Sequence, residues 1–333
     1  MLGRRNLLCR AVSESAVARA WSWVALVGLL ACGEDVASVD SPVVAAKPPA
    51  VAHSVALGNL SELSPAVRRA FEAHPEDFSP LPEPGADDWR NWNTEPPQSV
   101  GNFWVSGPNR PGNEGRDTLY ILPLGPVPDT SKLQAFAHDF FAVPVVVLEV
   151  ADLEGVDLTR RTHGSREQVL AVDLQTYLQS RLPDDAYAML GLTSEDIYPS
   201  DDYNYVFGLA STTERTGVFS FARYDPRFYE PSAAPNPVLK RERAFKILAH
   251  EAGHMFGIGH CLHHACVMNG ANHSEELDRA PLALCPVCLR KLHLLVGFDP
   301  KARYEALEQR YEDAELGEAA AFARTRIGRI TQE

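Results

Sequence analysis

The stretch HEAGHMFGIGHCLHHACVM, from His250 to Met268, determines how the rest of this sequence is interpreted. It places five histidines and two cysteines in nineteen residues, although the 333-residue chain contains only 11 histidines and six cysteines. Imidazole and thiolate groups are the preferred ligands of zinc and related ions in proteins. The composition of this one segment therefore predicts metal binding.

The first two histidines lie on a helical pattern. His250 and His254 are four residues apart in LKRERAFKILAHEAGHMF, which places both imidazoles on one face of a helix, about 5–6 Å apart. Two histidines at that separation can share a zinc ion. Glu251 follows the first histidine and is placed to act as general base on a water molecule at that ion.

The third histidine needs the chain to reverse. Gly257 can adopt the left-handed conformation that ends a helix, and it lies midway between His254 and His260. Three histidine ligands leave one coordination position open, as a catalytic zinc site requires. The pattern HExxHxxGxxH with a later methionine matches the signature of metzincin peptidases. Met268 is the candidate for the methionine turn, and ordinary core packing is the alternative.

Four of the six cysteines fall within this part of the chain, and Cys9 and Cys32 lie near the N-terminus. The four form one pair with four intervening residues and one with two, namely Cys261, Cys266, Cys285 and Cys288. Two close pairs of this kind are typical of a structural zinc site. Two disulfides are the alternative in an oxidising compartment. We favour zinc, because the CPVC spacing suits one ion and does not suit a bridge between its own cysteines.

Residues 1–31 have the pattern of a signal peptide, with four arginines before an apolar run at 21–31 that is too short to span a bilayer. The run ends in LLAC, which resembles a bacterial lipobox and predicts a lipid anchor at Cys32. A short buried helix or a mis-assigned start codon is the alternative. The pair Arg4-Arg5 also faintly resembles a twin-arginine export signal.

The rest of the chain divides by composition. We expect a flexible tether at 32–58, a Pro-rich irregular extension at 59–116, a metalloprotease domain at 117–298 and a charged helical tail at 299–333. Within the domain, strands alternate with helices, which predicts a mixed α/β sheet. The expected strands are 118–125, 143–150, 186–193, 203–211 and 217–224, and the expected helices are 131–142, 165–182 and 238–256.

The sequence from His250 to Leu292, HEAGHMFGIGHCLHHACVMNGANHSEELDRAPLALCPVCLRKL, closely resembles the archaemetzincin family. The resemblance runs from about Asp117 to His293 and includes YILPLG, YNYVFGLAS and VFSFARYDP. It implies a compact metzincin-like α/β domain, with a twisted mixed β-sheet, an active-site helix behind it and a zinc site formed by four cysteines. The site residues that it implies are a catalytic zinc on His250, His254 and His260, Glu251 as base, and a structural zinc on Cys261, Cys266, Cys285 and Cys288.

The resemblance also predicts how substrate binds. In metzincins an extended peptide pairs with an exposed edge strand above the metal, and here the strand 203–210 is the candidate. Gly208 would let a backbone approach closely. Proline at Val206 or Leu209, whichever amide faces outward, should then weaken substrate binding.

The function expected from these observations is zinc-dependent hydrolysis of peptide bonds in a peptide or protein substrate. The alternative is a non-catalytic zinc-dependent binding or scaffold lipoprotein, and the presence of Glu251 favours the enzyme. A formal charge of −13 and the lack of a basic stripe argue against a nucleic-acid partner. The leader predicts a bacterial cell-envelope lipoprotein attached to the membrane only through Cys32, whereas the family resemblance favours a cytoplasmic protein. Oligomeric state has no signature in the sequence.

Overall fold

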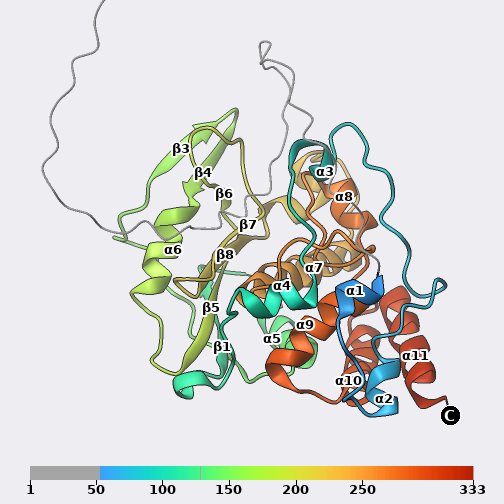
Figure 1. Ribbon diagram of the computed structural model, residues 1–333. Helices are drawn as coiled ribbons and strands as arrows, with labels where there is room; N and C mark the ends of the chain where they lie inside the picture. The colour runs from blue at the N-terminus through green and yellow to red at the C-terminus, as the bar shows by residue number, and fades with distance from the viewer. Residues whose placement is uncertain (1–52, 128, 333) are drawn as a thin grey trace, which may run out of the picture.

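The computed structural model describes residues 53–127 and 129–332 (Figure 1). The predicted signal peptide, Cys32 and the tether up to residue 52 lie outside the described residues. Across those two described ranges, no helix is both long enough and apolar enough to cross a membrane.

The central element is a five-stranded mixed sheet. Its order is β2 (Val145–Val147), β1 (Thr118–Leu124), β5 (Ala186–Thr193), β8 (Thr216–Ser220) and β7 (Gly208–Ser211). The first four strands are parallel, and β7 runs antiparallel at one edge. Every residue of β5 is buried, because helices cover both faces of the sheet. The predicted mixed α/β fold is confirmed.

A second, smaller sheet has three strands. It contains β3 (Arg160–His163), β4 (Arg166–Leu170) and β6 (Asp196–Tyr198), in that order. The two-residue turn Gly164-Ser165 joins β3 to β4, and Gly164 has the positive φ of 62° that such a turn needs. The predicted helix 165–182 is therefore wrong in its first part, since α6 (Ala171–Gln179) begins only after β4.

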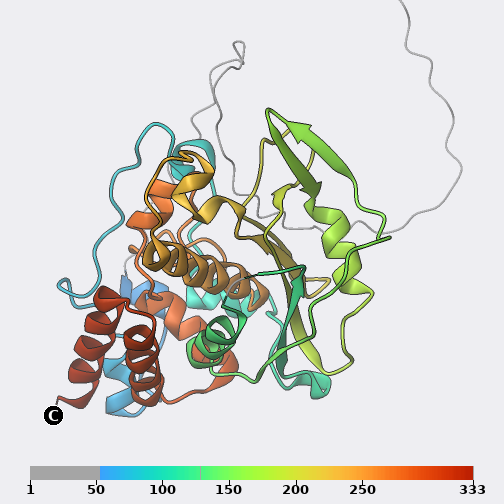
Figure 2. The ribbon, with the colours of Figure 1, turned by 180° about the vertical axis from the view of Figure 1, so that it is seen from behind.

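Two helices cover one face of the large sheet, and α6 covers the other. The long helix α7 (Pro237–Met255) contacts β7 and β8 and lies beside α5 (Thr130–Phe141), as Figure 2 shows from behind. The rings of Phe136 and Phe245 stack between α5 and α7 with centroids 4.3 Å apart. This packing holds the helix that carries the first two histidines against the antiparallel edge of the sheet.

The predicted charged tail forms the helix pair α10 (Pro300–Asp313) and α11 (Gly317–Thr331), on the side of the molecule away from the strands (Figure 1). The α10 helix packs on α5. The fully buried Arg326 of α11 forms an ion pair with the buried carboxylate of Asp77. The tail is thus bound to the N-terminal extension by a buried charge pair.

The Pro-rich extension contains only short helices. They are α2 (Pro65–Arg69), α3 (Trp89–Trp92) and α4 (Val100–Val105), and α1 (His53–Leu57) precedes them at the end of the predicted tether. Three single 3-10 turns occur at Asn113–Gly115, near the end of the extension, and at Ala222–Tyr224 and Pro226–Phe228 in the domain. Phe71, Trp89 and Phe103 of the extension belong to the same buried cluster as the residues of α7 and α10. One apolar core therefore includes residues from the extension, the domain and the tail, which were distinguished by their composition. The segment boundaries stay predictions.

Candidate metal centre and active site

Three histidines meet at the C-terminal end of α7. The Nε2 atoms of His250 and His254 are 3.0 Å apart, and a ligand nitrogen of His260 lies within 4.8 Å of both. Each of the three residues is at most 4% exposed. The predicted histidine triad is therefore brought together by the fold.

The hydrogen bonds of the Nδ1 atoms of His250 and His254 determine which ring nitrogen is unprotonated. His250 Nδ1 lies 2.9 Å from the carbonyl oxygen of Val267, and His254 Nδ1 lies 2.8 Å from that of Ile258. A carbonyl can only accept, so each Nδ1 carries the proton and donates it. Both Nε2 atoms are then unprotonated and face each other with two lone pairs and no hydrogen between them. That arrangement calls for a cation.

This donor set fits zinc. Burial lowers the pKa of His250 to about 3 and that of His254 well below its usual value, so both imidazoles are neutral, as metal ligands must be. Zinc–nitrogen bonds of about 2.0–2.1 Å in a tetrahedron place ligand nitrogens about 3.3 Å apart. His260 Nε2 is buried and has no hydrogen-bond partner among the described residues. A small shift of the rings would bring the three nitrogens to zinc-ligand spacing.

Gly257 reverses the chain between the second and third histidines, as predicted. Its φ is 75°, in the left-handed region, and its amide donates to the carbonyl of His254. Below the helix, a Cβ placed on Gly253 would lie 2.4 Å from the Sδ of Met268. Met268 thus packs directly against the backbone between the two helical ligands. Met268 therefore lies below the two helical histidines, at the place that the predicted methionine turn requires.

Glu251 lies beside the triad with its carboxyl group almost fully buried. The residue is 2% exposed, and its Oε2 has no partner among the described residues. Burial raises the pKa of Glu251 to about 8, and a cation nearby would lower that value. A Cβ on Gly208 of β7 would lie only 2.6 Å from the Cδ of Glu251. The glycine is required because its backbone approaches the Glu251 carboxylate.

The four cysteines form a second cluster. All are buried and none forms a disulfide, and their sulfur atoms all lie within 4.8 Å of one another. The Cys261 and Cys285 sulfurs are 3.5 Å apart. Zinc–sulfur bonds of about 2.3 Å in a tetrahedron give sulfur separations of about 3.8 Å. The cluster therefore fits one zinc ion, and the geometry does not match the alternative of two disulfides.

The two clusters share one loop. Cys261 directly follows His260, and its amide donates to the carbonyl of Met268 at 2.7 Å. The amide of Met268 in turn points to the sulfur of Cys266 at 3.5 Å. Cys285 and Cys288 come from the start of α9 (Pro286–Val296), where Cys285 is the N-cap residue. The CPVC segment thus forms the N-cap and first turn of a helix.

The edge strand is shorter than predicted and presents different amides. Only Gly208–Ser211 pairs with β8, whereas Val206 makes an isolated bridge to Ile197. Phe207 O accepts from Ser220, and antiparallel pairs alternate, so the Leu209 amide points to β8. The Val206 amide is also used, since it donates to Ile197. The amides that face the free edge are those of Gly208 and Ala210, which corrects the expected choice between Val206 and Leu209.

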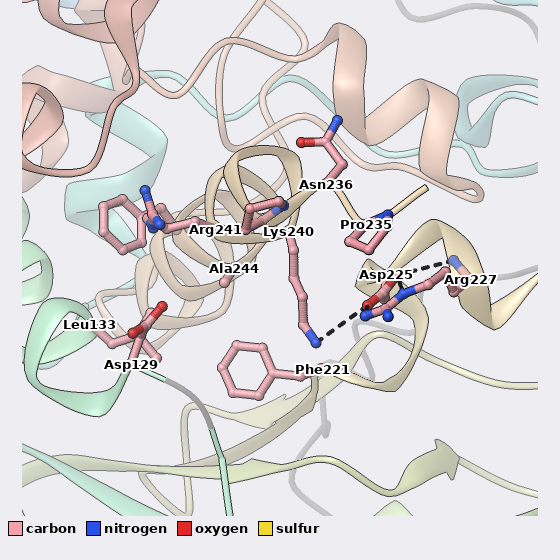
Figure 3. Close-up of a pocket in the computed structure, with 12 residues that line it drawn as sticks. Asp129, Leu133, Phe221, Asp225, Arg227, Pro235, Asn236, Lys240, Arg241 and Ala244 are labelled. Carbon is pink, nitrogen blue, oxygen red and sulfur yellow. Dashed lines mark hydrogen bonds and ion pairs between the residues drawn. The ribbon is translucent and has the colours of Figure 1, made fainter. Parts of the chain in front are cut away.

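A separate cavity of about 310 Å³ lies near the N-terminal ends of α5 and α7. Figure 3 shows Lys240 extending to Asp225, where Arg227 also ends. The Arg227 guanidinium holds the pKa of Asp225 below its usual range. The Asp225 carboxylate thus forms ion pairs with both cations in the cavity wall. We assign no role in catalysis to this cavity.

Three residues at the metal centre have no signal in the sequence. Glu95 Oε1 lies 2.9 Å from His260 Nδ1, and the Trp89 ring packs on the His260 ring with centroids 4.4 Å apart. Gln98 bonds to the loop that leads to His260. All three come from the Pro-rich extension, for which the composition predicts only an irregular segment.

The helix with two facing histidines, the third histidine after a glycine turn and the methionine below them define a metzincin-type metallopeptidase. The family model described as Peptidase family M54 matches residues 172–294. Archaemetzincin-2 from Macaca fascicularis is 32% identical over 289 residues, which is 77% of this chain and 80% of that protein. Archaemetzincin-2 from Homo sapiens is 31% identical over 281 residues, covering 74% of this chain and 78% of that protein.

A solved structure, the archaemetzincin from Methanopyrus kandleri, is 29% identical with a TM-score of 0.44, and the match covers 55% of this chain and 97% of that one. This chain belongs to the archaemetzincin family of zinc metallopeptidases. The predicted enzyme class is confirmed.

Proposed function

We propose that this peptidase uses two zinc ions per chain, one on His250, His254 and His260 for catalysis and one on the four cysteines for structure. The observation that carries the proposal is the pair of unprotonated Nε2 atoms 3.0 Å apart beside the buried, unpartnered oxygen of Glu251. Zinc at the triad supplies a Lewis acid that polarises the scissile carbonyl and makes a water molecule more acidic.

The residues of the chain carry out the proton transfers. Glu251 accepts a proton from the attacking water and returns it to the leaving amine. The backbone of Gly208 limits where the carboxylate can lie. The outward amides and carbonyls of Gly208 and Ala210 offer an extended peptide a strand with which to pair. We propose that substrate binds along this edge.

Two substitutions test the assignment of roles. Glu251→Ala should leave both metals bound and thermal stability nearly unchanged, but should reduce kcat by about 10²–10⁴-fold. His254→Ala should lose one zinc and all activity. Metal content of the purified protein and chelator-sensitive cleavage of a peptide library are the measurements. A zinc-loaded wild type that cleaves nothing in the library, while a partner still binds the Glu251→Ala variant, would instead indicate the scaffold function.

We further propose that the protein is a bacterial envelope lipoprotein with its mature N-terminus at Cys32. The support is the arginine-rich start, the short apolar run and the LLAC sequence. Several acyl chains on one cysteine give stable membrane attachment, whereas one chain does not. Cys32→Ala should release the protein from the membrane fraction. A wild type that is soluble with its leader intact would argue for the cytoplasmic alternative.

A further inference from the structure

The third histidine differs from the other two in what holds it. His250 and His254 donate to backbone carbonyls of their own neighbourhood, at Val267 and Ile258. His260 instead faces a carboxylate, Glu95, which precedes it by 165 residues in the chain. Its orientation therefore depends on a side chain of the N-terminal extension and not on the metal-binding loop itself.

Residues 88–98, which carry Glu95, are here called the clamp segment. This segment also forms hydrogen bonds with the loop that directly precedes His260. Gln98 Oε1 accepts from the amide of Gly259 at 3.0 Å and from Nζ of Lys291 at 2.8 Å. Its Nε2 donates to the carbonyl of Gly257 at 3.1 Å. Gln98 thus holds both peptide groups that flank Ile258, directly before the third ligand.

The beginning of the clamp segment is anchored to α8 (Ser274–Arg279). The Trp89 amide points at both carboxylate oxygens of Glu276, at 3.0 and 3.1 Å, and Asp88 accepts from Arg279 at 2.6 Å. Asp88, Glu276 and His273 are close enough to hold a metal. The carboxylate oxygens of Asp88 and Glu276, however, already accept from backbone amides and from the Arg279 guanidinium, so this group fixes the chain and has no need of a cation.

Trp89 completes the clamp by packing. It is 1% exposed, lies against the His260 ring and fills the space beside Gly270, where a Cβ would come within 2.3 Å of the indole. A ring so confined on one face, with its Nδ1 held by a carboxylate, has one orientation available. In that orientation the His260 Nε2 points toward the other two histidines.

We propose that the clamp segment is a working part of the metal centre and that Glu95 is the positioning residue of its third ligand. The inference rests on the proposed zinc binding by the triad. The Glu95 carboxylate accepts a hydrogen bond from the Nδ1–H of His260. This bond fixes the tautomer in which Nε2 is unprotonated, and it makes Nε2 a stronger electron-pair donor to a metal ion. Loss of such an outer partner typically costs about 10–100-fold in metal affinity. The Glu95 side chain is 40% exposed, so we expect the lower end, about tenfold.

The experiment measures metal affinity and not turnover. Zinc bound to the full-length chain is titrated with a chromophoric chelator for wild type, Glu95→Gln and Glu95→Ala. The exposed carboxylate Glu62 of the same extension provides the matched control, Glu62→Ala. The His254→Ala variant identifies which binding constant belongs to the histidines. We expect zinc to bind most weakly in Glu95→Ala, with Glu95→Gln intermediate because its amide oxygen still accepts the Nδ1 proton.

A spectroscopic measurement separates positioning from stability. The visible spectrum of cobalt(II) at the histidine site is obtained by subtracting the spectrum of cobalt-loaded His254→Ala. This difference spectrum should change in Glu95→Ala and should change less in Glu95→Gln. A Glu95→Ala protein with the affinity and the cobalt spectrum of Glu62→Ala would overturn the proposal. Lower thermal stability alone, with metal affinity unchanged, would overturn it too. If His254→Ala removes no metal from otherwise wild-type protein, the proposed zinc site itself is wrong.

Discussion

Replacing Gly208 with alanine tests whether the position of the Glu251 carboxylate controls the rate of peptide hydrolysis. The added Cβ would lie 2.6 Å from Cδ and 2.7 Å from Oε1 of Glu251, whereas ordinary contact begins at 3.4 Å. The carboxyl group must therefore withdraw by about 0.8 Å. A misplacement of about 1 Å can cost on the order of 10²-fold in rate. We expect kcat to fall by about that factor, which corresponds to about 2.7 kcal/mol.

The assay compares kcat and KM on a peptide that the wild type cleaves in a chelator-sensitive manner, together with zinc content. Gly217→Ala is the matched control, because Gly217 faces Ala210 in the same strand pair. Its added Cβ would meet the terminal methyl of Met255 at 2.6 Å, the end of a flexible side chain, and not the Glu251 carboxyl group. Equal rates for the two variants, with zinc retained in both, would refute the idea that the Gly208 backbone sets the position of Glu251.

Three further predictions concern other parts of the molecule. Cys285→Ser should lower the zinc content from two to one and reduce thermal stability, since metal binding is coupled to folding; detection of all four cysteines as disulfides in non-reducing mass spectra would contradict this. Ala210→Pro should raise KM while leaving both zincs bound, because it removes an outward amide of the edge strand; unchanged peptide kinetics would place the substrate elsewhere. Asp77→Ala should lower the free energy of unfolding by about 3–5 kcal/mol in denaturant titrations, because it leaves the buried Arg326 charge unpaired; a loss below about 1 kcal/mol, the value of an exposed pair, would contradict this.

The metal ligands could be predicted because they are local in the sequence. His250 and His254 are related by one helical turn, and Gly257 provides the left-handed residue that returns the chain. The cysteine pairs are equally close in sequence. Their chemistry is determined by spacing and residue type, so it can be inferred without knowledge of the fold.

The residues around the third ligand could not be found in this way. Glu95 and Trp89 lie in a segment without periodicity, and only tertiary packing brings them to His260. A lone glutamate among prolines has no feature that separates it from a solvent-exposed one. The contact spans 165 residues of sequence, and no local pattern encodes such a pairing.

The error at β4 has a different cause, because the signal was present. Gly164-Ser165 between two short polar runs is a recognised hairpin turn. The regular spacing of Val169 with later apolar residues suggested a helix instead. Val169 is fully buried, but it is buried as a strand residue paired with Ile197 of β6. A helical period that includes strand residues can arise where a strand leads directly into an amphipathic helix.

The loop shared by the two metal clusters has a thermodynamic consequence. Residues 260–268 contain one histidine ligand and two cysteine ligands, and the carbonyl of Val267 also holds His250. The binding free energy of the first ion must offset the entropy lost when this loop becomes ordered. The second ion then binds to a loop that is already ordered. Such coupling is reciprocal, so each ion must raise the affinity for the other by the same factor. The two zinc ions should therefore bind and dissociate cooperatively. Wild-type molecules that carry only one zinc ion should be rare.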